Sequence, residues 1–243
     1  MTVAAARAVE RALRDLASKD AIPAVARYFH ADETWAGDNR VLGVPMPKVF
    51  PVAKAHHKEV SLTGIERLLE SRYYEVRMAG VSIMDAQVRP RSAGDALKGD
   101  LHELYLRRHD RINSWDLVDR AAPHVVGAYL LERPRDVLDE LARSDNPWER
   151  RTAVVATAAF LRAGQLDDTF RLAEQLADDE HLYVQKALGS WVREAGKQDQ
   201  GRLVAFLESH GHRLLREALR TATEKLPARK RDGLRERLGG RPS

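Results

Sequence analysis

A short helical phrase recurs five times along the chain, and its spacing limits the folds that the chain can adopt. Each copy ends in an alanine, and successive alanines lie 42, 32, 34 and 31 residues apart. Such spacing is typical of a two-helix repeat, in which a small residue lets adjacent helices approach closely. Five copies in similar register favour a solenoid, because an ordinary bundle of alanine-rich helices would give only one or two such matches by accident. The copies are VRMA (76–79), VDRA (118–121), RRTA (150–153), VQKA (184–187) and LREA (215–218).

Apolar residues elsewhere also follow the period of an α-helix. Within 3–18, for example, Ala6, Val9 and Leu13 lie three or four residues apart. Hydrophobic residues make up 44% of the chain, charged residues 31% and aromatic residues 6%, a balance typical of helices with narrow apolar stripes. We therefore expect an all-α fold, with one repeat domain over 1–230. Residues 31–43, which include Trp35 and many turn formers, should form an exposed loop.

The distribution of charge limits where a polyanion could bind. The net charge is +4, but residues 227–243 hold six basic and two acidic residues, which leaves 34 of each sign in the rest of the chain. A nucleic-acid surface in the body of the chain therefore requires positive charge to be sorted onto one face. We expect 231–243 to be a basic C-terminal tail that is loose and solvated. The alternative is an arm that binds phosphates.

Composition excludes several classes of chemistry. The chain has no cysteine, so it has no disulfide, thiol nucleophile or cysteine-ligated zinc. Its nine histidines form no convincing metal site, and glycine-rich phosphate loops, GxSxG elbows and HExxH helices are absent. No apolar run is long enough to cross a bilayer, and residues 1–19 are unlike a signal peptide. We expect a soluble, cytoplasmic protein that needs no metal and no cofactor.

The position two residues before each recurring alanine should project onto one surface, because equivalent positions of stacked repeats align. Arginines occupy three of the five positions, and guanidinium groups bind phosphate oxygens well. The one carboxylate, Asp119, would repel a polyanion, so it either neutralises neighbouring arginines or takes part in chemistry. The five residues are Arg77, Asp119, Arg151, Gln185 and Arg216.

Asp119 shares a predicted helix face with Trp115, which lies four residues before it. On residue types alone, the pair is best explained as a core indole and an interhelical salt bridge from Asp119 to Arg151. Asp116 belongs to the first turn of the same predicted helix, where a carboxylate suits the helix dipole. It needs no functional explanation.

Three segments resemble the AlkD-type alkylpurine DNA glycosylases, which are HEAT-like repeat proteins. They are SWDLVD (114–119), SDNPWERRTA (144–153) and YVQKALGSWVREAGK (183–197). The similarity extends from about 101 to 226 and thins toward the N-terminus to ARY (26–28) and LGV (42–44). It implies a right-handed solenoid of HEAT-like repeats with a concave cleft that binds double-stranded DNA containing alkylated purines. The protein would be a nucleoid-associated monomer.

The resemblance also implies roles for individual residues. Asp119 would be the catalytic carboxylate, and Trp115 an aromatic wall against the damaged nucleotide. Arg151 would hold Asp119 ionised and bind the adjacent phosphate. Ser190 stands where the family usually presents a second cleft tryptophan, and the nearest indole, Trp191, is turned about 100° round the helix. Further DNA contacts are expected from Tyr28, Arg77, Lys186, Arg193 and Arg216.

The resemblance favours a monofunctional glycosylase that excises N3- or N7-alkylated purines without enclosing the base in a pocket. Such an enzyme could also accept bulky adducts. The alternative is a non-catalytic relative that binds distorted or branched DNA, and the serine at position 190 keeps this alternative open. A HEAT scaffold for other proteins would instead predict an apolar or mixed concave face, which the predicted arginine surface opposes.

Overall fold

The computed structural model describes residues 2–27 and 39–242. Over these residues the regular secondary structure is helical, and β pairing is limited to three isolated bridges. The expected all-α class is therefore confirmed, whereas the right-handed solenoid stays a prediction. Within the same ranges, every helix is too short or too polar to span a bilayer. The chain forms two compact units, Met1–Tyr129 (unit 1) and Leu130–Ser243 (unit 2).

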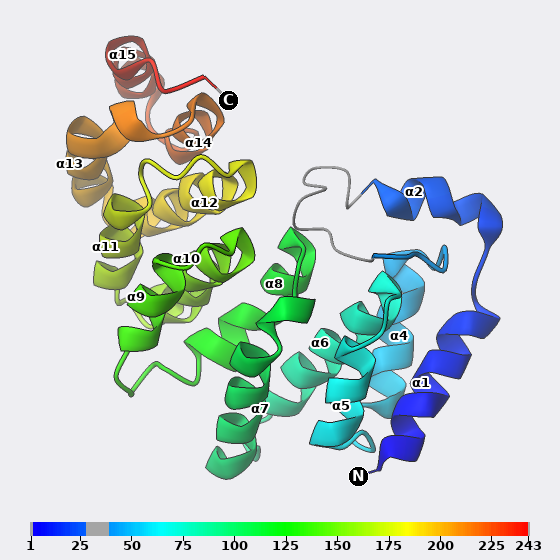
Figure 1. The fold of residues 1–243 in the computed structure, drawn as a ribbon. Coiled ribbons are helices and arrows are strands. Elements are labelled where there is room, and N and C mark those ends of the chain that lie inside the picture. The colour runs from blue at the N-terminus through cyan, green and yellow to red at the C-terminus, as the bar shows by residue number, and fades with distance from the viewer. Residues whose placement is uncertain (1, 28–38, 243) are drawn as a thin grey trace. The chain divides into compact units, whose positions relative to one another are not determined.

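Unit 1 contains two rows of helices. Its helices are α1 (Val3–Asp15), α2 (Ile22–Ala26), α4 (Met46–His56), α5 (Leu62–Leu69), α6 (Tyr74–Val88), α7 (Asp95–Arg107) and α8 (Trp115–Ala121), with short segments η1 (Lys19–Ala21), η2 (His109–Arg111) and the π-helical η3 (Ala122–Gly127). One row packs α4, α6 and α8 side by side, and the other packs α1, α5 and α7 (Figure 1). Helix α6 contacts both rows, and 14 of its 15 residues are buried. It forms the core of the unit.

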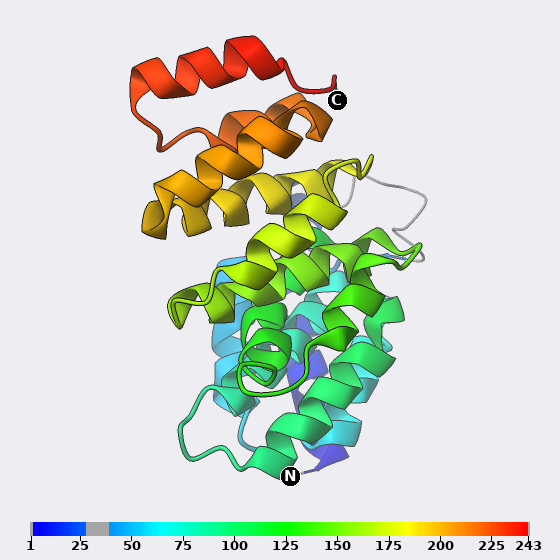
Figure 2. The same ribbon diagram turned by 90° about the vertical axis from the view of Figure 1, so that its left-hand side faces the viewer.

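Unit 2 repeats the two-row arrangement. Its helices are α9 (Asp136–Ala142), α10 (Pro147–Arg162), α11 (Asp167–Gln175), α12 (Leu182–Gln198), α13 (Gln200–His210), α14 (Arg216–Ala222) and α15 (Ala228–Leu238), with a short η4 (Gly211–Arg213). Helices α10, α12 and α14 pack in one row, and α9, α11, α13 and α15 pack in the other (Figure 2). Asn146 caps α10 by accepting a hydrogen bond from the Trp148 amide (3.0 Å), as expected for this residue type before Pro147.

The recurring alanine is buried in every copy of the phrase, as a close approach of helices requires. None is more than 2% exposed. At the last copy, a Cβ on Gly189 of α12 would lie 2.6 Å from the carbonyl oxygen of Ala218 in α14. The two helices can approach this closely because residue 189 has no side chain. The alanines are Ala79, Ala121, Ala153, Ala187 and Ala218.

The loop expected over 31–43 is not exposed at its end. Gly43 and Val44 are buried, because the Glu75 carboxylate accepts hydrogen bonds from the amides of Leu42 (3.0 Å), Gly43 (2.9 Å) and Val44 (3.1 Å). Gly43 also has a φ of 78°, a conformation that favours glycine. Tyr28 and Trp35 lie outside the described residues.

The expectation of a loose, solvated tail over 231–243 is wrong. Helix α15 runs to Leu238 and packs against α13, with Leu234 only 1% exposed (Figures 1 and 2). Beyond it, the Arg241 backbone pairs with Leu214 and Arg216 (2.8 and 2.7 Å), and its guanidinium donates to the carbonyl of Arg213 (2.5 Å). These contacts tie the basic segment to unit 2.

Candidate functional site

Helix α8 carries Trp115 and Asp119, and its first turn is fixed against α6. The Asp116 carboxylate accepts hydrogen bonds from the Ser114 hydroxyl (2.7 Å), from the Leu117 amide (3.0 Å) and from the hydroxyl of Tyr74, a buried residue of α6. Asp116 therefore does more than suit the helix dipole, because it joins the start of α8 to the central helix of unit 1.

Asp119 is exposed to solvent, and Trp115 is half-buried. The residues of α8 that pack into the core are Leu117, Val118 and Ala121. Asp119 therefore lies on the side of the helix that turns away from the core, where its carboxylate can meet a ligand. The predicted pairing of Asp119 with Arg151 stays a prediction.

A buried carboxylate holds two arginines and a histidine next to this helix. Asp85 of α6 is 1% exposed and pairs with Arg89 (2.9 Å), His124 (2.8 Å) and Arg120 (3.3 Å). Burial alone would raise the pKa of Asp85, but hydrogen bonds from His124 and Arg89 and the charge of Arg120 lower it below its ordinary value. Asp85 therefore stays ionised and fixes the positions of its partners.

Arg120, which follows Asp119 in the chain, is held on several sides. Its guanidinium lies over the ring of Phe50 at 5.0 Å from the centroid and donates to the Ser82 hydroxyl (2.9 Å) in addition to pairing with Asp85. Phe50 is one of two large hydrophobic residues that are exposed within the described ranges. Arg120 thus presents a fixed positive charge beside an exposed ring.

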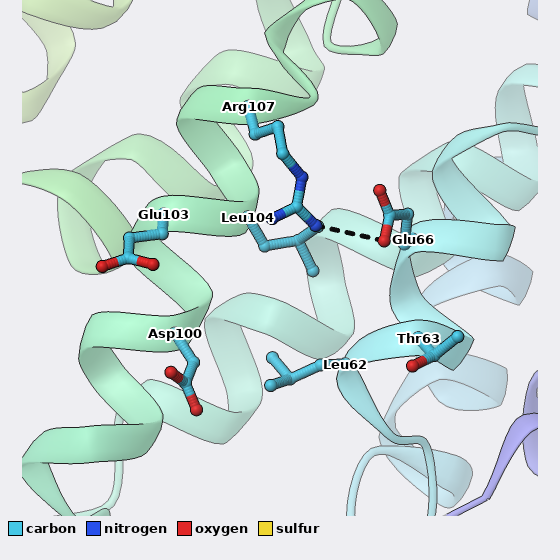
Figure 3. A pocket seen from close by; sticks show the side chains of 7 residues that line it. All are labelled: Leu62, Thr63, Glu66, Asp100, Glu103, Leu104 and Arg107. Carbon is cyan, nitrogen blue, oxygen red and sulfur yellow. Dashed lines mark hydrogen bonds and ion pairs between the residues drawn. The ribbon is translucent and has the colours of Figure 1, made fainter.

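The surface between α5 and α7 carries the opposite charge. A hollow of about 220 Å³ there is lined by Glu66, Asp100 and Glu103 as well as by Arg107, which pairs with Glu66 at 3.1 Å (Figure 3). A polyanion would be repelled by this surface. Basic and acidic side chains of unit 1 are therefore separated, with basic residues gathered around Asp85 and acidic residues lining the hollow between α5 and α7.

The expectation that the positions before the recurring alanines share one exposed surface is wrong. Arg77 and Gln185 are 0% exposed and Arg151 is 6% exposed, whereas Asp119 and Arg216 are exposed. Two of the buried side chains, Arg77 and Gln185, turn inward and donate to carbonyl groups just past the ends of α5 and α11, which lack intrahelical partners. The predicted arginine surface therefore does not exist in the form expected.

Arg77 shows the physical reason most clearly. Its guanidinium donates to the carbonyl of Ser71 (2.8 Å) and to the side-chain oxygens of Asn113 (3.2 Å) and Asn39. Its side chain is fully buried, which argues against the predicted contact of Arg77 with DNA, and that contact stays a prediction. Gln185 is used in the same way, since its amide donates to the carbonyls of Leu176 (3.2 Å) and Ala177 (3.0 Å).

Arg151 of α10 is held from within unit 2. Its guanidinium donates to the carbonyl of Tyr183, and the adjacent Arg150 pairs with Asp179 at 2.6 Å. The Tyr183 ring lies 5.7 Å from that of Trp148, which is buried. A phosphate could reach Arg151 only through the small part of its side chain that is exposed.

The predicted cations of α12 are accessible but paired. Lys186 lies 3.6 Å from Glu217 and 5.1 Å from the centroid of the Tyr183 ring. Arg193 pairs with Glu224 (2.7 Å) and Glu194 (3.1 Å). Each side chain is partly exposed, so a phosphate would compete with these glutamates. On the same helix, Ser190 and Trp191 are both half-buried.

Sequence reasoning missed the roles of Glu75 and Asp85. The spacing of Asp85 and Arg89, four residues apart on a helix, could have indicated an ion pair. The partners Arg120 and His124 come from α8 and η3, and spacing along α6 could not indicate them. Across the part of the chain that the structure describes, no three acidic or histidine side chains are placed to hold a metal ion.

Comparison with known proteins places the chain in a family. The family model for the DNA alkylation repair enzyme matches residues 9–226, which is most of the chain. A search of curated proteins found no match. The matched region contains the start of α8, the buried Asp85 group and all of α12. The chain therefore belongs to the DNA alkylation repair enzyme family.

Proposed function

We propose that this protein is a monofunctional DNA glycosylase that hydrolyses the N-glycosidic bond of N3- and N7-alkylated purines in double-stranded DNA. The observation that carries the proposal is the exposed carboxylate of Asp119, one helical turn from Trp115, in a chain of the DNA alkylation repair enzyme family. Alkylation at N3 or N7 gives the purine a positive charge, so the base leaves as a neutral molecule and needs no general acid.

Asp119 would act electrostatically. As the bond breaks, positive charge gathers on the deoxyribose, and a fixed carboxylate can stabilise it and orient the attacking water. Opposite unit charges about 4 Å apart attract by about 4 kcal/mol at an effective dielectric constant of about 20. That energy corresponds to about a thousandfold in rate. The Trp115 ring would add a cation–π attraction for the same charge.

The DNA backbone would be bound by the accessible cations of unit 2. We propose contacts from Arg216, which is exposed at the start of α14, and from Lys186 and Arg193, whose glutamate partners a phosphate would displace. Arg151 would contribute through its small exposed part. Ser190 and Trp191 are candidates for the wall of the cleft.

A lesion left in or near the base stack would meet Asp119 without entering an enclosed pocket. This route differs from that of glycosylases that extrude the base. Selectivity would then come from the lability of the cationic lesion, and bulky minor-groove adducts would be tolerated. The serine at position 190, where the resemblance leads us to expect an indole, favours a wider cleft.

The second candidate is a relative that binds distorted or branched DNA without breaking a bond, and Ser190 is the observation that favours it. A predicted arginine surface was the reason to disfavour a scaffold that binds other proteins. Because Arg77, Arg151 and Gln185 are buried, that reason is weaker. Membership of a DNA repair family favours DNA as the partner.

The test is release of free base from duplex DNA that carries one N7-methylguanine. We expect base release well above spontaneous depurination, and we expect DNA binding, measured in parallel by fluorescence anisotropy, to fall steeply with salt. Binding without release of any of several alkylated bases, small and bulky, would favour the binding-only protein. If the protein neither binds the DNA nor releases a base, the result would favour a scaffold for other proteins.

A further inference from the structure

A second hollow in unit 1, at the C-terminal end of α6, has a lining unlike that of the acidic hollow. It has a volume of about 410 Å³, and its lining includes Arg89, Arg91, Lys98, His124, Ala128 and Tyr129. None of the described residues that line it is acidic. The volume lies within the range of roughly 300–1,000 Å³ that is usual for small-molecule sites.

The basic side chains of this hollow differ in how they are held. Arg89 and His124 are fixed by the buried carboxylate of Asp85 (2.9 and 2.8 Å). Arg91 and Lys98 form no ion pair with any residue that the structure describes. The hollow therefore combines an arginine and a histidine in fixed positions with two further side chains, Arg91 and Lys98, whose positive charge is available to an anion.

An aromatic ring forms another part of the wall. Tyr129 is half-buried, and the ring of His102 packs against it with centroids 4.5 Å apart. Its hydroxyl would lie 3.2 Å from a Cβ on Gly99 of α7. A glycine weakens the interior of a helix, but here it leaves room for Tyr129 to lie against α7. The ring is thus held in place at the hollow.

We propose that this hollow binds a nucleoside monophosphate, either as a free nucleotide or as the phosphorylated end of a DNA strand. Arg91 and Lys98 would bind the phosphate, because charge-assisted hydrogen bonds to phosphate are strong. The Tyr129 ring would stack on the base, since every base has a face that an aromatic ring can meet. The site uses neither Asp119 nor Trp115, so the inference does not depend on the proposed glycosylase activity.

The experiment uses the full chain and two forms of the ligand. Calorimetric titration measures binding of deoxyadenosine 5′-monophosphate, deoxyadenosine and inorganic phosphate. Fluorescence anisotropy compares duplexes with a 5′-phosphorylated overhang and with blunt ends. The variants are Arg91→Ala with Lys98→Ala, and Tyr129→Leu with Tyr129→Phe as the version that keeps the ring. The matched control is Lys54→Ala with Lys58→Ala, which removes two exposed lysines outside the hollow.

We expect the nucleotide to bind more tightly than deoxyadenosine or phosphate alone. Loss of Arg91 and Lys98 should weaken nucleotide binding by at least about tenfold. The control substitutions should weaken nucleotide binding by less than about twofold. Tyr129→Phe keeps the aromatic ring and should bind the nucleotide like wild type. If Tyr129→Leu proves unstable, Tyr129→Phe still tests whether the ring, rather than the hydroxyl, supports binding. Equal effects on free nucleotide and overhang indicate a nucleotide site, and an effect confined to the overhang indicates a strand end.

Failure of the inference can be told apart from failure of the proposed function. Excision of N7-methylguanine is measured in the same variants and should be unchanged when Arg91 and Lys98 are lost. The inference is overturned if the nucleotide and the overhang both fail to bind, if the nucleotide binds no more tightly than inorganic phosphate, or if the control variant loses as much affinity as the hollow variant.

Discussion

Replacing Asp85 by asparagine should destabilise unit 1 substantially. The carboxylate is 1% exposed and pairs with Arg89, His124 and Arg120 at 2.9, 2.8 and 3.3 Å. Removal of one member of a buried ion pair typically costs about 3–5 kcal/mol. The three partners are 51%, 25% and 31% exposed, so water can recover part of their solvation. We therefore expect a loss of about 2–3 kcal/mol, or about 4–12 °C in Tm for a chain of this size.

The loss of stability caused by Asp85→Asn should depend on pH in a direction set by the lowered pKa of Asp85. Burial raises this pKa, but the hydrogen bonds from His124 and Arg89 and the charge of Arg120 lower it below the ordinary value of 3.8. A carboxyl group with a lowered pKa stabilises the folded state above its unfolded pKa, and that stability is lost as the pH falls through the folded pKa. The difference in stability between wild type and Asp85→Asn should be largest at neutral pH and should shrink below about pH 4.

The assay is thermal and urea unfolding followed by circular dichroism from neutral pH to pH 3. The matched control is Asp178→Asn, because Asp178 also pairs with an arginine, Arg213 at 2.7 Å, but its side chain is 62% exposed. An exposed pair contributes little, so the control should unfold close to wild type. Equal losses in the two variants, or a difference for Asp85→Asn that persists undiminished at pH 3, would refute this account of the buried group.

Three further substitutions test particular contacts. Arg77→Met should lower Tm yet leave the salt dependence of DNA binding unchanged, because the guanidinium is buried; a slope of log K against log salt smaller by about 1 would show that Arg77 does bind a phosphate. Gly189→Ala should cost about 1–3 kcal/mol in urea unfolding, since the new Cβ would lie 2.6 Å from the Ala218 carbonyl oxygen; unchanged stability would argue against the close approach of α12 and α14. Ser190→Trp should tighten binding to N7-methylguanine DNA by up to about tenfold through stacking, and no change in affinity would remove residue 190 from the cleft.

The helices and their small contact residues could be predicted from the sequence because they depend on local patterns. Apolar periodicity set the all-α class, and the alanine in each phrase is buried as expected. The orientation of the residue two positions earlier could not be predicted in the same way. Whether Arg77 reaches a phosphate or the Ser71 carbonyl depends on where the ends of neighbouring helices lie, and spacing along one helix does not contain that information.

Other features depend on contacts between distant segments. The basic C-terminal residues were expected to form a loose tail because chain ends are usually poorly ordered, yet Leu234 and the Arg241 backbone anchor them to unit 2. Asp85 is an unremarkable residue of α6 in the sequence, and its role appears only when Arg120 and His124 are brought beside it. The candidate site was easier to find, because Trp115 and Asp119 lie on one helix and belong to a segment that resembles a known family.

The central claim is that the Asp119 carboxylate stabilises positive charge on the sugar. Single-turnover excision of N7-methylguanine by Asp119→Asn tests it most directly, with Asp100→Asn, another exposed carboxylate of unit 1, as the control. We predict that Asp119→Asn slows excision by about a thousandfold and binds DNA as tightly as wild type or more tightly, because a repulsive charge is removed. Asp100→Asn should excise the base at the wild-type rate. Excision by Asp119→Asn at the rate of wild type would contradict the claim.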